Sequence, residues 1–248
     1  MRAMESATLN PTSRPAEKPI VRFGQSSDLS KTVEVHKAAF PNSFLTVLGD
    51  RFLHELYVGF LRDKTSIYLV AEEKGRQLGL VVGTTEPQDF FKRLLIRRWF
   101  AFLCAGFTGL LKNPARVAKR FLFALVYRGE TPPGLNGATL LSSIGVIPAH
   151  GGRGFGALLI ERFCQEAASR GSASVYLLTD REGNDAVNLF YLKCGFSLDS
   201  HVERQKRRTM NRYVRPIGNL ACAKSNPAPR LHSQCLTSVA NSPREQAE

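Results

Sequence analysis

The segment from residue 140 to residue 171 limits the possible folds more than any other part of the chain. An apolar run over residues 140–146 predicts a strand, which leads into a turn rich in glycine. From Gly154 to Arg170, apolar residues recur at spacings of three and four, which predicts a helix that ends at Gly171. A strand that passes through such a turn into a helix is typical of α/β proteins.

The turn also has the chemistry of a phosphate site. The first amides of a helix lack intrahelical acceptors and carry a partial positive charge, so they bind anions. Glycine leaves the backbone uncovered, and an anion can therefore approach these amides closely. The turn predicts a diphosphate site formed by Gly151, Gly152, Arg153, Gly154, Phe155 and Gly156.

Composition restricts the partners and the compartment. The chain has 248 residues and a formal net charge of +13 at pH 7, which favours anionic partners. Its five cysteines lack paired or metal-type spacing, so we expect reduced thiols in a cytoplasmic protein and no metal site. The N-terminal residues lack the apolar segment of a secretory signal, and no uncharged apolar run reaches the roughly 18 residues of a membrane span.

One domain is expected over residues 19–215. Residues 1–18 are polar, and residues 216–248 are rich in Ser, Asn, Pro and Ala without periodicity, so both ends are expected to be disordered. Between them the pattern is mixed α/β. In chain order we expect a strand at 20–23, a helix capped by Asp28 or Ser30 and ending at Ala39, a helix at 44–61, strands at 66–71, 78–84 and 140–146, a helix at 154–170, a strand at 173–178, a helix at 185–193, and strands at 196–202 and 208–214.

A second motif begins 30 residues after Gly154, where residues 184–196 read NDAVNLFYLKCGF. Together with the glycine turn, it resembles the GNAT N-acetyltransferase superfamily. That family has a turn of the form R/Q-x-x-G-x-G/A and a later N-x-x-A-x-x-x-Y-x-x-x-G-F signature. In this sequence Gly151 occupies the position of the family's Arg or Gln, and Val187 replaces the usual Ala.

The resemblance implies a mixed, mostly antiparallel central sheet flanked by helices, with a helical insertion. It also implies transfer of an acetyl group from acetyl-CoA to an amine by direct attack, without a metal. The strand residues Ile144, Gly145 and Val146 would lie along the pantetheine arm, with Gly145 leaving room for the acyl group. Asn184 would cap its helix, contact the cofactor, or do both, and Tyr191 would protonate the departing thiolate.

The general base is left open. Residues 139–146 contain no carboxylate, and Ser142 and Ser143 cannot act as bases alone. Asp180 follows the next strand and is the preferred candidate, with His150 as a second one. Deprotonation through water without a protein base is a third possibility.

Residues 88–133 are longer than the family pattern requires and strongly basic. They include an uncharged apolar stretch at 99–111, after which Asn113 and Pro114 are typical of the start of a second basic helix, through Tyr127. The insertion is interpreted either as a helical lid over the acceptor groove or as a surface, 88–128, that contacts an anionic membrane peripherally. Nucleic acid is not an expected partner.

Two alternatives to the enzyme are considered. Residues 152–157 also fit a dinucleotide-binding G-x-G-x-x-A turn with Asp180 as the acidic partner, but too few residues follow for the remaining β-α units. The chain could otherwise be a degenerate scaffold that binds CoA or a membrane surface without turnover. The acceptor, whether an amino sugar, a small amine or a protein N-terminus, does not follow from the fold.

Overall fold

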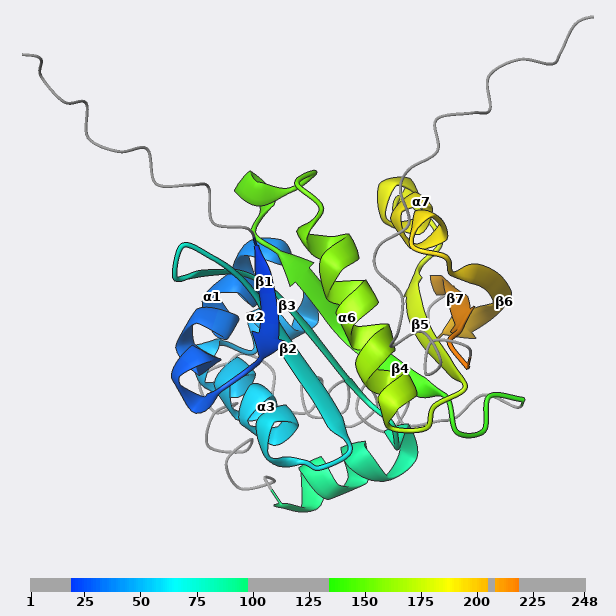
Figure 1. Ribbon diagram of the computed structural model, residues 1–248, viewed down its shortest axis with the longest axis horizontal. Helices are drawn as coiled ribbons and strands as arrows, with labels where there is room; N and C mark the ends of the chain where they lie inside the picture. Colours follow the sequence, from blue (N-terminus) through cyan, green and yellow to red (C-terminus); the bar gives the residue numbers. More distant parts are fainter. Residues whose placement is uncertain (1–18, 98–133, 205–207, 219–248) are drawn as a thin grey trace, which may run out of the picture.

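The computed structural model describes residues 19–97, 134–204 and 208–218. A seven-stranded sheet in the order β1-β2-β3-β4-β5-β7-β6 forms its centre, with helices against it (Figure 1). Among the described strand pairs, only β4 and β5 run parallel, so the predicted mixed, mostly antiparallel sheet is confirmed. The elements are β1 (Ile20–Phe23), η1 (Ser26–Asp28), α1 (Leu29–Ala39), α2 (Phe44–Val47), α3 (Asp50–Arg62), β2 (Ser66–Glu73), β3 (Arg76–Thr84), a helix over 87–97, β4 (Thr139–Val146), η2 (Pro148–His150), α6 (Phe155–Ser169), β5 (Ser174–Asp180), α7 (Asp185–Lys193), β6 (Ser197–Arg204) and β7 (Arg208–Pro216).

Glycine conformation explains one success and one error of the sequence predictions. The predicted hairpin turns from β2 to β3 through Lys74 and Gly75, which have φ values of 52° and 71°. Two successive positive φ values are typical of the tight turns that fit the twist of paired strands. The single helix predicted over 44–61 is wrong, because Gly49 has a φ of 95° and separates α2 from α3.

The central strands of the sheet are buried on both sides. Successive residues of β2 alternate between two cores, as the two-residue period of a strand requires. Tyr68 and Val70 lie in a cluster with α1 and α3, on what we call the α1 face. Ile67 and Leu69 lie in a cluster with α6 and Tyr191 of α7, on what we call the α6 face.

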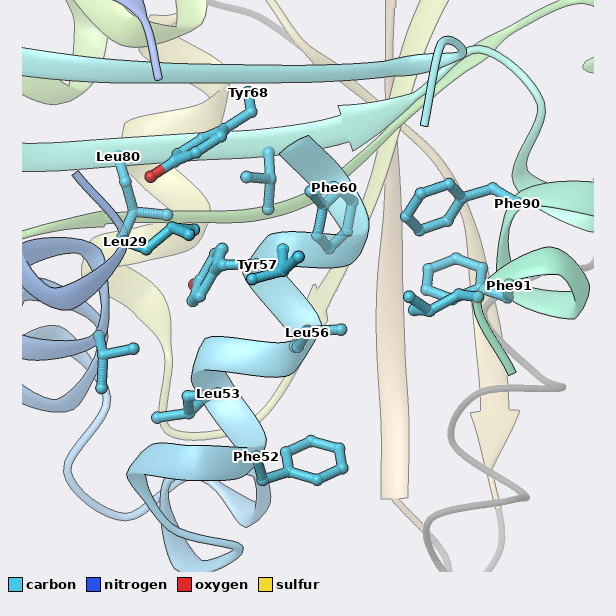
Figure 2. Packing of buried hydrophobic residues seen from close by; sticks show 14 of the residues in the cluster. Leu29, Phe52, Leu53, Leu56, Tyr57, Phe60, Tyr68, Leu80, Phe90 and Phe91 are labelled. Atoms are coloured by element: carbon cyan, nitrogen blue, oxygen red, sulfur yellow. The ribbon is translucent and has the colours of Figure 1, made fainter. Parts of the chain in front are cut away.

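The helix over 87–97 is the first part of the predicted basic insertion, and it belongs to the core. Figure 2 shows Phe90 and Phe91 beside Phe60 of α3, and the ring centroids of Phe60 and Phe90 are 4.6 Å apart. Arg93 pairs with Asp63 at 2.9 Å. The apolar stretch 99–111 and the predicted helix after Asn113 lie outside the described residues. No helix in the described ranges is long and apolar enough to cross a membrane.

The strands β4 and β5 are paired only where β4 begins. Their parallel ladder consists of the pairs Thr139–Val175 and Leu140–Tyr176. On the other edge of β4, the register with β3 shifts by one residue, which leaves Ser142 as the extra residue of a bulge. We call the boundary between β4 and β5 beyond Leu140 and Tyr176 the seam.

Candidate active site

The strand β4 presents backbone groups to the seam, because its ladder with β5 ends at Leu140. The predicted residues Ile144 and Val146 pack against the α6-face core. A Cβ at Gly145 would lie 2.9 Å from Ala39 Cβ and 3.0 Å from Phe40 Cε2. The absence of a side chain at Gly145 therefore lets the end of α1 approach the strand.

The glycine loop between β4 and α6 has the open form that the sequence predicts. Gly152 and Gly154 have φ values of 74° and 84°, and a Cβ on either would meet nothing within 4 Å. Gly154 is the N-cap of α6, so the first amides of this helix begin at an uncovered loop. Gly151 differs, because its amide already donates to the carbonyl of Pro148 at 2.9 Å.

Arg153 is engaged within the protein. Its guanidinium donates to Glu73 Oε1 at 2.7 Å and to His150 Nδ1 at 2.9 Å, and it lies 5.2 Å from the centroid of the Phe155 ring. A guanidinium has only donors, so His150 Nδ1 must accept. A neutral His150 then carries its proton on Nε2 and has no free lone pair, which disfavours it as the general base.

The two sequence motifs meet in space. A Cβ at Gly156 of α6 would lie 3.0 Å from Phe190 Cζ of α7, so the glycine allows the two helices to approach closely. The next residue, Tyr191, is buried, with its ring centroid 5.9 Å from that of Phe196 and 6.0 Å from that of Tyr213. Burial raises the pKa of Tyr191 well above its usual value, so its hydroxyl stays protonated at neutral pH.

Asn184 stands at the N-cap of α7 as predicted, but its side chain does not cap the helix. Instead, Asn184 Nδ2 donates to Thr179 Oγ1 at 2.7 Å and to the Asp180 carbonyl at 3.2 Å. The expected capping hydrogen bond is therefore wrong. The side chain ties the start of α7 to the end of β5.

Asp180 lies half-buried at the end of β5, opposite Met210 of β7. Alternation along β5 from Tyr176, which belongs to the α1-face cluster, places Asp180 on the α1 face. Tyr191 belongs to the α6-face cluster. The predicted acid and the preferred base thus lie on opposite faces of the sheet.

A chain of amides near Asp180 escaped the sequence predictions. Asn188 Nδ2 donates to the Asp180 carbonyl at 3.2 Å, and Asn211 Nδ2 donates to Asn188 Oδ1 at 3.1 Å. Asn211 Oδ1 is 2.9 Å from His201 Nδ1, which must therefore donate. Because the Asp180 carbonyl only accepts, Asn188 Nδ2 must be the donor, and this fixes the orientation of the side-chain amides of Asn188 and Asn211. The register of β6 with β7 pairs His201 with Asn211, whereas Asn188 comes from α7, so no local pattern marks the three residues.

Comparison with known proteins agrees with this architecture. The model of the acetyltransferase (GNAT) family matches residues 29–196. A putative GNAT acetyltransferase from Desulfovibrio desulfuricans has a TM-score of 0.54 at 14% identity, over 81% of this chain and 99% of that one. A chimera of spermidine N-acetyltransferase SpeG from Vibrio cholerae and hSSAT has a TM-score of 0.53 at 17% identity, over 83% and 99%.

An N-acetyltransferase from Staphylococcus aureus Mu50 has a TM-score of 0.51 at 14% identity, over 81% of this chain and 99% of that one. At such identities, these structures establish the likeness of fold alone. No curated protein is significantly similar in sequence. In the part of the chain that the structure describes, no cluster of three or more His, Cys, Asp or Glu side chains could hold a metal ion.

Proposed function

Because the chain belongs to the GNAT acetyltransferase family, we propose that it transfers an acetyl group from acetyl-CoA to an amine acceptor. The observation that carries this proposal is the open glycine loop at the start of α6, which follows β4 and η2. Among the described residues, the edge of β4 that faces β5 is paired only up to Leu140. The amides of the loop can donate hydrogen bonds to a diphosphate, and the backbone groups of the neighbouring strand can pair with the extended pantetheine arm of acetyl-CoA.

The residues present fit acetyl-CoA. The amides of Gly152, Gly154 and the first turn of α6 would hold the diphosphate, because no described atom lies within 4 Å of where a Cβ would stand on either glycine. The edge of β4 from Ile144 to Val146 would pair with the pantetheine arm as an added strand does, and one of its amides would polarise the thioester carbonyl. Asn184 would contribute through Oδ1, because its Nδ2 already donates to Thr179 and Asp180.

Bound acetyl-CoA supplies an acetyl group activated as a thioester. The acceptor amine attacks the thioester carbon, so the C–N bond forms while the C–S bond breaks and the sulfur keeps the bonding electron pair. Tyr191 gives its proton to the sulfur and recovers one from solvent. The nitrogen loses one proton to Asp180 or to water. The products are an amide and the CoA thiol, which balances atoms and charge.

Calorimetric titration of acetyl-CoA into the wild type and into Gly154→Glu tests the cofactor site. We expect Gly154→Glu to weaken binding by about tenfold or more, because it places an anion at the helix N-terminus. Gly171→Glu is the matched control, since Gly171 has a φ of 85° and equally open surroundings at the opposite end of α6. Equal losses in both variants, or no binding by the wild type, would contradict the proposal.

A second candidate function is CoA binding without turnover. The absence of a carboxylate from residues 139–146 favours it, because no base stands on β4. Acetyl-CoA binding without thiol release in the presence of amines would identify it. Four further expectations stay predictions: the domain limits 19–215, the disordered ends, a cytoplasmic location, and contact of residues 88–128 with an anionic membrane.

A further inference from the structure

We propose that Glu73, which is distant in sequence from the glycine loop, positions this loop for the cofactor by holding Arg153. The inference rests on the proposed function and deepens it, because it attributes the order of the diphosphate site to a salt bridge with β2. Glu73 is the last residue of β2 and belongs to neither of the motifs that the sequence analysis singled out.

The glycine loop, residues 151–154, has few hydrogen bonds of its own. Three of its four residues are glycines, and Gly152 and Gly154 have positive φ values, which glycine adopts freely. Within the described residues, no backbone carbonyl accepts a hydrogen bond from the amides of residues 152–154. These amides are therefore available to an anion. A loop without backbone hydrogen bonds, however, loses much conformational freedom when a ligand orders it, and this loss weakens binding.

Arg153 carries the only side chain in this loop, and groups outside the loop hold it in place. Its Nη2 donates to Glu73 Oε1 at 2.7 Å, and its Nη1 donates to His150 Nδ1 at 2.9 Å. The guanidinium also lies 5.2 Å from the centroid of the Phe155 ring. Because Arg153 stands between the two glycines with positive φ, fixing its side chain restrains the flexible residue on either side of it.

The other partner of the salt bridge is anchored in the sheet. Glu73 pairs with Arg76 across the hairpin from β2 to β3, and only 16% of its side chain is exposed. The backbone carbonyl of Leu78 in β3 accepts from the amide of Ile147, directly before η2, at 2.9 Å. A backbone hydrogen bond at one end and the salt bridge at the other thus connect the hairpin to the segment between β4 and α6.

Charge alone would give Glu73 the opposite effect. A carboxylate near a diphosphate repels it, so a purely electrostatic role predicts tighter binding when the carboxylate is removed. If Arg153 left Glu73 to contact the diphosphate, it would leave a largely buried carboxylate unpaired near an anion, which is unfavourable. Arg153 therefore stays with Glu73 when the cofactor binds, and the amides of the loop contact the phosphates.

Two substitutions of Glu73 separate the hydrogen bond from the charge, because both remove the same carboxylate. Glu73→Gln keeps an oxygen that can accept from Arg153, whereas Glu73→Ala keeps no acceptor. Calorimetric titration of acetyl-CoA should give Glu73→Gln a Kd equal to or lower than that of the wild type, and Glu73→Ala a Kd about fivefold higher. The KM for acetyl-CoA should rise in Glu73→Ala without a change in kcat, because neither residue of the pair touches the reacting atoms.

Glu166→Ala is the matched control. Glu166 pairs with Arg170 at 2.8 Å near the opposite end of α6, and its side chain is also 16% exposed. Both alanine variants lose one salt bridge, but only Glu73→Ala should raise the acetyl-CoA Kd. Arg153→Ala alone should also raise it by about fivefold. In the Arg153→Ala background the salt bridge is already absent, so Glu73→Gln and Glu73→Ala should give the same Kd.

Three results would overturn the inference: equal Kd values for Glu73→Gln and Glu73→Ala, equal Kd values for Glu73→Ala and Glu166→Ala, or a difference between the two Glu73 variants that persists in the Arg153→Ala background. In each case the wild type still binds acetyl-CoA. Failure of the wild type to bind acetyl-CoA would instead overturn the proposed function.

Discussion

At the scale of single residues, two buried tyrosines face opposite sides of the sheet at the site. Tyr191 belongs to the α6-face core and Tyr176 to the α1-face core. Burial raises the pKa of both, so both hydroxyls stay protonated at neutral pH. Tyr191 therefore holds the proton that the proposed general acid must donate, whereas Tyr176 lies in the core on the other side of the sheet.

Tyr191→Phe should separate binding from chemistry. We expect kcat to fall by about a hundredfold or more, because the general acid is lost, while the calorimetric Kd of acetyl-CoA stays unchanged. Tyr213→Phe is the control, since Tyr213 packs against Tyr191 in the same core. A kcat in Tyr191→Phe equal to that of the control would refute the role of this phenol as the acid.

Residues marked by backbone chemistry were predictable, and residues placed by tertiary packing were not. The positive φ values of Gly152 and Gly154 follow from a glycine-rich strand-to-helix turn. The close approach of Phe40 to Gly145 brings together two elements that are distant in sequence. The hydrogen bond from Asn184 to Thr179 depends on where β5 ends. The bulge at Ser142 was not predicted, because it depends on the register of β4 with β3.

At the scale of elements, strand and helix positions were largely predictable because hydrophobic periodicity is local. The predicted helix over 185–193 and hairpin from β2 to β3 are confirmed. The split at Gly49 was missed, because the apolar residues at spacings of three and four continue across it. The pairing of β6 with β7, on which the amide chain depends, was predicted as a hairpin without its register.

The amide chain joins three elements at the end of β5, and Asn211→Asp tests its importance. The carboxylate would place an acceptor against Asn188 Oδ1, so we expect the free energy of unfolding to fall by about 1–3 kcal/mol. We also expect a lower kcat, because α7 carries Tyr191. Urea unfolding measures the free energy of unfolding, and thiol release from acetyl-CoA measures kcat. Glu203→Gln, on the exposed surface of the same hairpin, should change neither the free energy of unfolding nor kcat. If the two variants behave alike, the amide chain does not matter for stability or activity.

At the scale of the whole molecule, several buried acidic groups make stability sensitive to alkaline pH. Burial raises the pKa of Tyr68 to about 12 and that of Cys164 to about 12, and also raises the pKa of Tyr176 and Tyr191. The folded state therefore keeps these protons at pH values where the unfolded state releases them. Their contribution to stability is complete below the unfolded pKa and is lost as the pH rises toward the folded pKa.

Urea unfolding at about pH 8 and at about pH 11 should show this loss, with about 1 kcal/mol lost per buried tyrosine between pH 10 and 11. Tyr176→Phe should lose about 1 kcal/mol less than the wild type over the same interval, since phenylalanine does not titrate. An identical loss in both proteins would show that Tyr176 ionises as easily in the folded state as in the unfolded state.

The short ladder between β4 and β5 also makes the sheet mechanically uneven. Backbone hydrogen bonds connect β1 to β4 and, separately, β5 to β6, so each part resists bending as one stiff plate. Two residue pairs at one end join the plates, and α6 contacts β2, β3 and β4 on one plate and β5 on the other. The packing of α6 therefore contributes to the angle between the plates and hence to the width of the seam.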